Sequence, residues 1–331
     1  MKQLEKQKQT EQEEVMKKRH REEEAEKKQL CGRHYTVSIA LPGSILDNAQ
    51  TPELRTYLAG QLARAAVVFN VDEIVIFDEI GVKETTTTEG EFNGVGKKGN
   101  ASVQMARVLQ YLECPQYLRK SFFPCHSDLK YAGLLNPLDT VHHVRIHDDS
   151  SYREGVVLKK PVKGDKGSFV NVGLGKEVLI DKQLKPGVRV TVKMDASTKA
   201  TKCHRGIAVA PTAPRTETGL YWGYSVRLAP NLGAVFTGCP HKGGYDMLIG
   251  TSERGDDLDQ FTLTPFQHLL VVFGGLQGLE ASLDADADLK VDDPRLLFHH
   301  YLNTCPQQGS HTIRTEVSEH MSTARFTHYQ D

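Results

Sequence analysis

The amino-acid sequence predicts an α/β protein whose parallel sheet is interrupted by a small antiparallel β-barrel. Residues 35–79 run strand, helix, strand, which is how a parallel sheet is built. Residues 144–210 contain only short β-like runs separated by Gly, Pro and Asp. From Tyr221 onward, strand-like runs again end in loops of small and polar residues. The expected units are a charged helical or disordered tail at 1–30, a sheet domain at 31–141 and 212–331, and a barrel at 142–211.

Composition limits the possible classes of protein. The chain has 331 residues, of which 39% are hydrophobic and 25% charged, enough for one large or two ordinary domains. Its net charge of −1 means that any nucleic-acid surface is a local patch. The six cysteines form no C-x-x-C pair, and there is no secretory signal or long apolar run. We therefore expect a reduced, intracellular, soluble protein without a membrane segment.

The first thirty residues differ from the rest of the chain. They mix both signs of charge and contain very few apolar side chains. Glu and Lys spaced three or four apart support a solvated helix, but no sustained heptad predicts a coiled coil. The segment is either a frayed charged tail or a docking segment for a protein partner.

The sheet domain opens with the strand "YTVSIALPGSIL" at 35–46. A helix is expected next, because Thr51 can cap it and Pro52 occupies its first position. Its apolar face would contain Leu54, Leu58, Leu62 and Ala65. "VDEIVIFDE" at 71–79 is a buried-type strand, and another helix, broken by Pro115, is expected within 103–123.

The predicted barrel lies among many lysines. Alternation of Val188, Val190 and Val192 indicates half-buried antiparallel strands. The nearby cations are Lys159, Lys160, Lys163, Lys166 and Lys176. A small barrel of this kind can bind single-stranded nucleic acid. The alternative is a structural insert whose lysines are merely solvated.

Three loops carry the chemistry of the sheet domain. "GTSERG" at 250–255, "GGLQG" at 274–278 and "QGSHTIRT" at 308–315 follow successive strands, so their strand ends should meet at one pocket. The dinucleotide fingerprint, the P-loop and the G-x-S-x-G elbow are absent. The glycines either allow a flat ligand to approach or only form tight turns. Cys125-His126 and His142-His143 lack the spacing of a zinc site, so no metal is expected.

These loops resemble those of a known family. "LIGTSERG", "LLVVFGGLQGLE" and "YLNTCPQQGSHTIRTE" are similar to the three cofactor loops of SPOUT-class RNA methyltransferases. "YTVSIALPGSIL" and "CHSDLKYAGLLNPLDT" resemble segments of the subgroup that carries an inserted OB-like barrel. The resemblance spans residues 31–316. It implies a trefoil knot near the C-terminus, S-adenosylmethionine as cofactor, a homodimer, and a location in nucleus and cytoplasm, at spindle, centrosome, centromere and kinetochore.

The resemblance also implies roles for individual residues. Glu253 and Arg254 would orient the acceptor, a base or ribose atom of RNA such as N3 of uridine. The cofactor residues would be Thr251, Ser252, Gly275, Gly278, Leu279, Asn303, Thr304, Gly309, Ser310, Thr312, Ile313 and Arg314. Independently of the resemblance, the lysines of the barrel and the cationic residues before it are expected to bind RNA: Lys159, Lys160 and Lys163, with His142, His143 and Arg145.

The end of the chain departs from the family pattern. A long apolar helix is expected after "TIRTE", but this chain continues as "VSEHMSTARFTHYQD". Only Val317, Met321 and Ala324 keep a helical spacing. Two functions therefore stay open: a methyltransferase, or a non-catalytic protein that binds RNA or serves as a spindle or kinetochore scaffold. A Rossmann-type enzyme is disfavoured because its fingerprint is missing.

Overall fold

The structure is a computed structural model that describes residues 32–79, 101–162, 167–195, 203–275, 277–310, 313–315 and 317–319. The predicted tail at 1–30 and the segment after Glu319 lie outside these ranges. Lys163, Lys166 and Thr312, which the sequence singled out, lie outside them as well. The knot expected near the C-terminus depends on the path of this last segment and stays a prediction.

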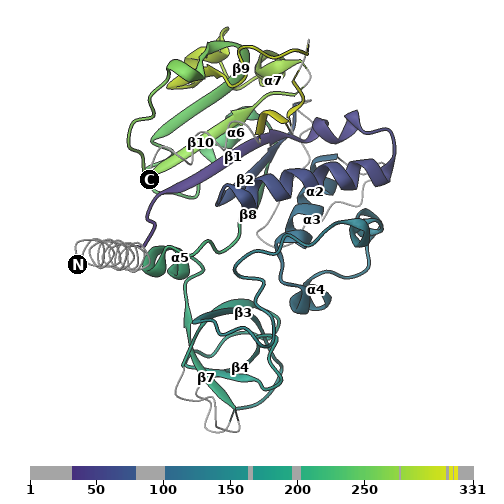
Figure 1. Cartoon of the computed structure of the whole chain (residues 1–331), viewed down its shortest axis with the longest axis vertical. Helices are drawn as coiled ribbons and strands as arrows, with labels where there is room; N and C mark the ends of the chain where they lie inside the picture. Colours follow the sequence, from purple (N-terminus) through teal and green to yellow (C-terminus); the bar gives the residue numbers. More distant parts are fainter. Residues whose placement is uncertain are drawn as a thin grey trace, which may run out of the picture.

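A six-stranded sheet forms the body of the protein (Figure 1). Its strand order is β11-β9-β10-β1-β2-β8, and every neighbouring pair is parallel. The strands are β1 Thr36–Pro42, β2 Glu73–Phe77, β8 Ser225–Ala229, β9 Met247–Asp257, β10 His268–Phe273 and β11 His300–Asn303. The predicted parallel α/β sheet is confirmed.

Both faces of this sheet are covered, as a parallel sheet requires. Alternate residues of a strand point to opposite faces, so Ile39 joins one apolar cluster and Ala40 joins the other. The first cluster includes side chains of α2 (Pro52–Val68) and α3 (Ala101–Glu113). The second includes side chains of α6 (Leu232–Thr237) and α7 (Gly278–Asp284).

Helix α2 begins where the sequence predicts. Thr51 Oγ1 accepts a hydrogen bond from the Leu54 N–H at 3.3 Å, and Pro52 is the first helical residue. Leu58, Leu62 and Ala65 are buried as expected. Leu54 is not, because this first-turn side chain is 51% exposed. The buried face therefore starts one turn later than predicted.

The remaining helices are short and connect the larger elements. Their bounds are α4 Gln116–Phe122, α5 Ala213–Thr218, and the 3-10 helices η1 Gly43–Asn48, η2 Ser127–Leu129, η3 Ala132–Leu134, η5 Leu258–Gln260 and η6 Pro294–Leu297. No helix among the described residues combines the length and the apolar character needed to cross a bilayer.

A closed barrel follows α4 and its connecting segment, and Figure 1 shows it below the sheet. Its strands are β3 Tyr152–Val157, β4 Ser168–Asn171, β5 Val178–Ile180, β6 Arg189–Met194 and β7 His204–Val209, closed in the order β3-β4-β5-β7-β6. The predicted barrel is confirmed, but it is not wholly antiparallel, because β5 and β7 are parallel. A closed ring of five strands cannot alternate direction at every step, so at least one parallel pair is required.

The barrel is joined to the sheet domain by a buried polar network. Glu154 on β3 accepts hydrogen bonds from Thr191 Oγ1 and Trp222 Nε1, both at 2.6 Å. Arg189 Nε donates to the same carboxylate at 2.8 Å and also reaches Glu113 at the end of α3. Trp222 belongs to the segment that leads back into the sheet, so the network joins both connections of the barrel.

Candidate active site

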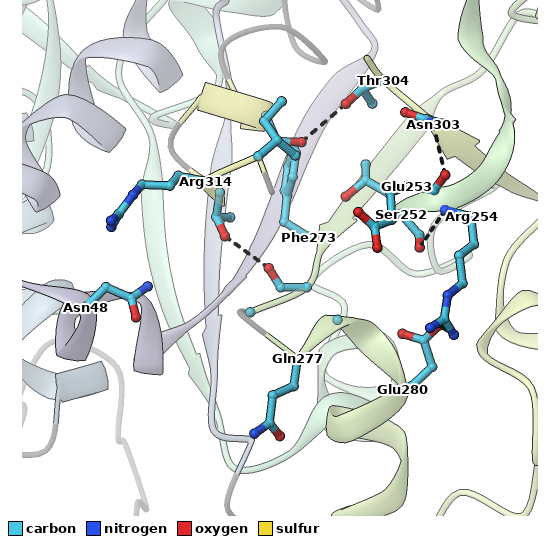
Figure 2. Close-up of a pocket in the computed structure, with 17 residues that line it drawn as sticks. Asn48, Ser252, Glu253, Arg254, Phe273, Gln277, Glu280, Asn303, Thr304 and Arg314 are labelled. Atoms are coloured by element: carbon cyan, nitrogen blue, oxygen red, sulfur yellow. Dashed lines mark hydrogen bonds and ion pairs between the residues drawn. The ribbon is translucent and has the colours of Figure 1, made fainter. Parts of the chain in front are cut away.

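A pocket lies where the carboxyl ends of β9, β10 and β11 meet, at the edge predicted from the sequence (Figure 2). Its volume is about 290 Å³. Ten predicted site residues line it: Thr251, Ser252, Glu253, Arg254, Gly275, Gly278, Asn303, Thr304, Ile313 and Arg314. Adjacent strands of a parallel sheet end side by side, which is why loops far apart in sequence converge here.

The first wall of the pocket comes from β9. Thr251 is buried, and its hydroxyl donates to the Val272 carbonyl at 3.1 Å. The segment 250–255 was expected to be a loop, but β9 continues through it to Asp257. β10 ends opposite Thr251, and β11 then pairs with β9 as far as Asp257 after a register shift. Ser252 and Glu253 lie within this register shift, between the two stretches of β9 that pair with β11.

The second wall is the turn after β10. Gly278 has φ of +79°, a left-handed conformation that favours glycine, and its N–H donates to the Gly275 carbonyl at 3.1 Å. A Cβ on Gly274 would lie 2.8 Å from the Gly278 backbone carbon. Leu279 was predicted to contact the cofactor, but it is fully buried in the second apolar cluster. It supports the turn from beneath, because the first turn of α7 directs it to the sheet.

The third wall is the segment after β11. Asn303 Nδ2 donates to the Glu253 carbonyl at 2.9 Å, which fixes this wall against the first. Thr315 Oγ1 donates to the Gly274 carbonyl at 3.1 Å, which fixes it against the second. Gly309 and Ser310 were predicted to bind cofactor, but both are exposed and neither lines the pocket.

Sequence reasoning missed several polar groups of this pocket. Asn48, the last residue of η1, lies on the same side as Arg314, opposite Glu253 and Arg254 (Figure 2). Glu280 pairs with Arg254 at 3.4 Å. The sequence could have indicated Asn48. It lies in η1, which directly follows β1, and the carboxyl end of β1 lies at the same edge of the sheet.

The residues present fit a nucleoside-type cofactor such as S-adenosylmethionine. Gly274, Gly275 and Gly278 line the pocket without side chains, so a flat base can approach their backbone. Hydroxyls of Thr304 and Ser252 and backbone groups of all three walls supply hydrogen-bonding partners. The volume lies near the lower end of small-molecule sites, roughly 300–1,000 Å³. Within the described ranges, no cluster of His, Cys, Asp or Glu is arranged to hold a metal ion.

The predicted RNA-binding residues lie away from this pocket. Lys159 and Lys160 are exposed on the barrel, and Arg145 is exposed on the segment before it. His143 is half-buried. The structure places His142 away from the surface, because its ring is fully buried and donates through Nε2 to the Glu113 carbonyl at 2.8 Å. This histidine serves the junction between sheet and barrel.

Comparisons with known proteins give a consistent result. A family model described as "Putative RNA methyltransferase" matches residues 36–324. The human protein named 28S rRNA (uridine-N(3))-methyltransferase is 60% identical over 306 residues, which are 92% of this chain and 81% of that protein. Its namesake from Mus musculus is 62% identical over 86% of this chain and 74% of its own length. The one from Drosophila melanogaster is 53% identical over 85% of this chain and 59% of its own length.

One solved structure shows a weak likeness. The SpoU methyltransferase AviRb from Streptomyces viridochromogenes, in complex with AdoMet, covers 91% of this chain and 60% of its own at 11% identity. Its TM-score of 0.33 is too low to support an argument. The family match, in contrast, extends across the sheet domain and the barrel alike.

Proposed function

Because this chain belongs to the RNA methyltransferase family whose model it matches, we propose that it methylates N3 of a uridine in 28S rRNA with S-adenosylmethionine as donor. The convergence of three strand ends and a glycine turn on one pocket carries this proposal. The printed name of the 60% identical human protein supports the choice of RNA and of atom.

S-adenosylmethionine supplies an already activated methyl group when it is bound. The glycines 274, 275 and 278 and the segments 303–304 and 313–315 would hold it, because they form two of the three walls of the pocket. The protein then has mainly to align donor and acceptor and to exclude water. Thr251 and Thr304, both buried at the base of the pocket, help to exclude water.

Uridine N3 carries a proton that must leave during the transfer, so a base is needed. We assign this role to Glu253, an exposed carboxylate at the pocket lined by Ser252 and Arg254. Arg254 and Asn48 provide N–H donors that stabilise the negative charge spread onto the uracil oxygens. The Arg254–Glu280 pair keeps the guanidinium near this wall.

The test combines activity with cofactor binding. Purified protein is incubated with labelled donor and unmodified 28S rRNA, and the nucleosides are separated. We expect 3-methyluridine as the product, and a loss of at least 100-fold in rate for Glu253→Gln with unchanged affinity for S-adenosylhomocysteine. Asp292→Asn, an exposed acid elsewhere, is the matched control. A methylated ribose or another base as product contradicts the proposal.

We also propose that the barrel binds the RNA backbone. Lys160 lies over the Phe169 ring at 5.1 Å and pairs with Glu177 at 2.6 Å, while Lys159 is exposed beside it. Cations next to an aromatic face are typical of single-strand binding surfaces. RNA affinity should therefore fall steeply as salt is raised.

We further propose a homodimer, and a location in nucleus and cytoplasm, at spindle, centrosome and kinetochore. The resemblance of the sequence to its family supports both proposals. Light scattering of the purified chain tests the first, and a mass of 36.9 kDa would contradict it. Imaging of the tagged chain through mitosis tests the second, and a diffuse signal at every stage would contradict it.

A further inference from the structure

A second cavity lies between the sheet domain and the barrel, and none of its lining residues belongs to the pocket of Figure 2. We call it the interdomain cleft. Its volume is about 1030 Å³. The residues that carry the argument are Arg64 of α2, Tyr117 of α4, His143 and Arg145 of the connecting segment, and Gly173 of the barrel. Clefts between domains are frequent ligand sites.

His143 lines this cleft and carries one ring nitrogen that can accept a hydrogen bond. Its Nε2 lies 2.6 Å from the Glu113 carbonyl oxygen. A carbonyl only accepts, so Nε2 must carry the proton and Nδ1 has a lone pair. Burial, with the neighbouring His142 ring at 4.5 Å, lowers the His143 pKa to about 4. The ring is therefore neutral at physiological pH, and no residue in the described ranges donates to Nδ1.

Cations lie on the same cleft. Arg145 is 76% exposed and pairs only loosely with Asp139, at 3.6 Å. Arg64 donates to the carbonyl oxygens of Leu138 at 3.1 Å and Pro137 at 2.5 Å, which fixes its guanidinium at the cleft wall. A ligand that suits this set carries negative charge and a hydroxyl donor.

The walls of the cleft are held in place before any ligand arrives. Tyr117 Oη donates to the Glu154 carbonyl at 2.7 Å, which joins α4 to the barrel. Gly173 has φ of +76° and packs directly on the Tyr117 ring, where a Cβ would lie 2.7 Å from the ring. A site whose groups are already held in place loses less conformational entropy when a ligand binds.

From these contacts we propose that the interdomain cleft binds a nucleotide of the substrate RNA other than the reacting uridine. His143 Nδ1 accepts a hydrogen bond from the ribose 2′-hydroxyl, and Arg145 and Arg64 face the phosphate. The 2′-hydroxyl is the group by which a protein separates RNA from DNA. This inference rests on the proposed function, because it takes RNA as the ligand.

The experiment compares three single-stranded 12-mers by fluorescence anisotropy: oligouridylate, its 2′-deoxy form and its 2′-O-methyl form. The 2′-O-methyl form keeps the ribose oxygen but cannot donate a hydrogen bond. We expect the unmodified RNA to bind about tenfold more tightly than either analogue, which corresponds to about 1.4 kcal/mol. Equal affinity of all three strands for the wild-type chain overturns the proposal.

Two variants sharpen the assignment. His143→Phe should bind RNA as weakly as DNA and leave DNA affinity unchanged, whereas Arg145→Ala should weaken both about equally. His34→Phe, an exposed histidine of the sheet domain, is the matched control and should keep the preference. A folded His143→Phe protein that still prefers RNA overturns the role of His143. If this variant does not fold, the test is the affinity of the wild-type chain for the 2′-O-methyl strand. Affinity equal to that for the unmodified RNA then overturns the role of His143.

Cofactor binding separates this proposal from the proposed function. S-adenosylhomocysteine is titrated calorimetrically into each variant, and its affinity should be unchanged. An RNA preference in a chain that binds no S-adenosylhomocysteine supports the cleft and contradicts the enzymatic proposal. Cofactor binding without any RNA preference contradicts the cleft and leaves the enzymatic proposal standing.

Discussion

Arg189 on the barrel forms a two-pronged ion pair with Glu113 at the end of α3. Its Nη1 donates to Oε2 at 2.7 Å and its Nη2 to Oε1 at 2.9 Å. Burial by itself would raise the Glu113 pKa, but the charge of Arg189 and hydrogen bonds from His142 and Arg189 hold this pKa well below its usual range. The orientation of the barrel relative to the sheet therefore depends on a charged contact that remains intact at physiological pH.

Loss of Arg189 should strongly destabilise the protein. Arg189→Met leaves the carboxylates of Glu113 and Glu154 buried without their shared cation. Breaking a buried pair in this way costs about 3–5 kcal/mol in the free energy of unfolding. Urea unfolding measures it. Lys193→Met breaks an exposed pair with Glu217 and should cost far less. Equal effects of the two substitutions would refute the role given to Arg189.

The glycine turn should tolerate no side chain at Gly274. A Cβ there would meet the backbone of Gly278 and Leu279 at 2.8 Å, and backbone atoms cannot swing aside as a flexible side chain does. We expect Gly274→Ala to weaken S-adenosylhomocysteine binding at least tenfold in calorimetry. Gly243→Ala, where no atom lies within 4 Å of the added Cβ, is the control. Wild-type affinity in Gly274→Ala would show that the turn does not contact the cofactor.

Stability should fall as the pH falls from 7 to 5. The His143 pKa is lowered to about 4 in the folded protein, so below its ordinary value of about 6.5 only the unfolded chain takes up the proton. This difference in proton uptake costs about 2 kcal/mol between pH 7 and pH 5. Below about pH 4.5 the Glu113 carboxylate adds a loss of the same sign, because its pKa is lowered.

Urea midpoints at the two pH values measure this effect. His143→Gln should reduce the change between pH 7 and pH 5, leaving the part due to His241 and His300, whose pKa values burial also lowers. His34→Gln should keep the whole change. A pH dependence that His143→Gln leaves unaltered would assign it to other groups.

The barrel wall formed by β4, β5 and β7 should contribute base stacking. Phe169 lies opposite Leu179 in the register and Leu179 lies opposite Arg205, so one outer row carries an aromatic ring and a cation. We expect Phe169→Ala to weaken binding of oligouridylate by about 1–3 kcal/mol. Val68→Ala, an exposed apolar residue of α2, should leave it unchanged. Unchanged affinity in Phe169→Ala would show that the RNA does not stack on this wall of the barrel.

Local signals explain most of the fold that the sequence predicted. The Thr51 cap, Pro52 and the apolar runs of the strands depend on neighbouring residues, and they placed α2 and the central strands. The continuation of β9 to Asp257 was not predicted, because it depends on pairing with β11 some fifty residues later. The parallel β5–β7 pair follows from closure of the ring, which no local pattern encodes.

For the candidate site, the sequence predicted the position of the pocket but not the direction of every side chain. The pocket itself follows from three strand ends, each visible in the sequence, and ten of the proposed residues line it. Side-chain direction does not follow from sequence. Leu279 turns into the core and His142 turns into the junction, and both directions depend on packing against segments distant in the chain.

The position of β1 at the centre of the sheet has a consequence for synthesis of the chain. β2, on one side, follows within a few tens of residues, but Thr36 pairs on the other side with His268, which lies 232 residues later. During translation, β1 therefore keeps one apolar edge open until β10 has left the ribosome. An open edge of this kind invites pairing with other chains. The barrel, whose strands lie within 152–209, can fold during this delay, so the nascent chain carries a closed barrel before strands β8 to β11 have been synthesised.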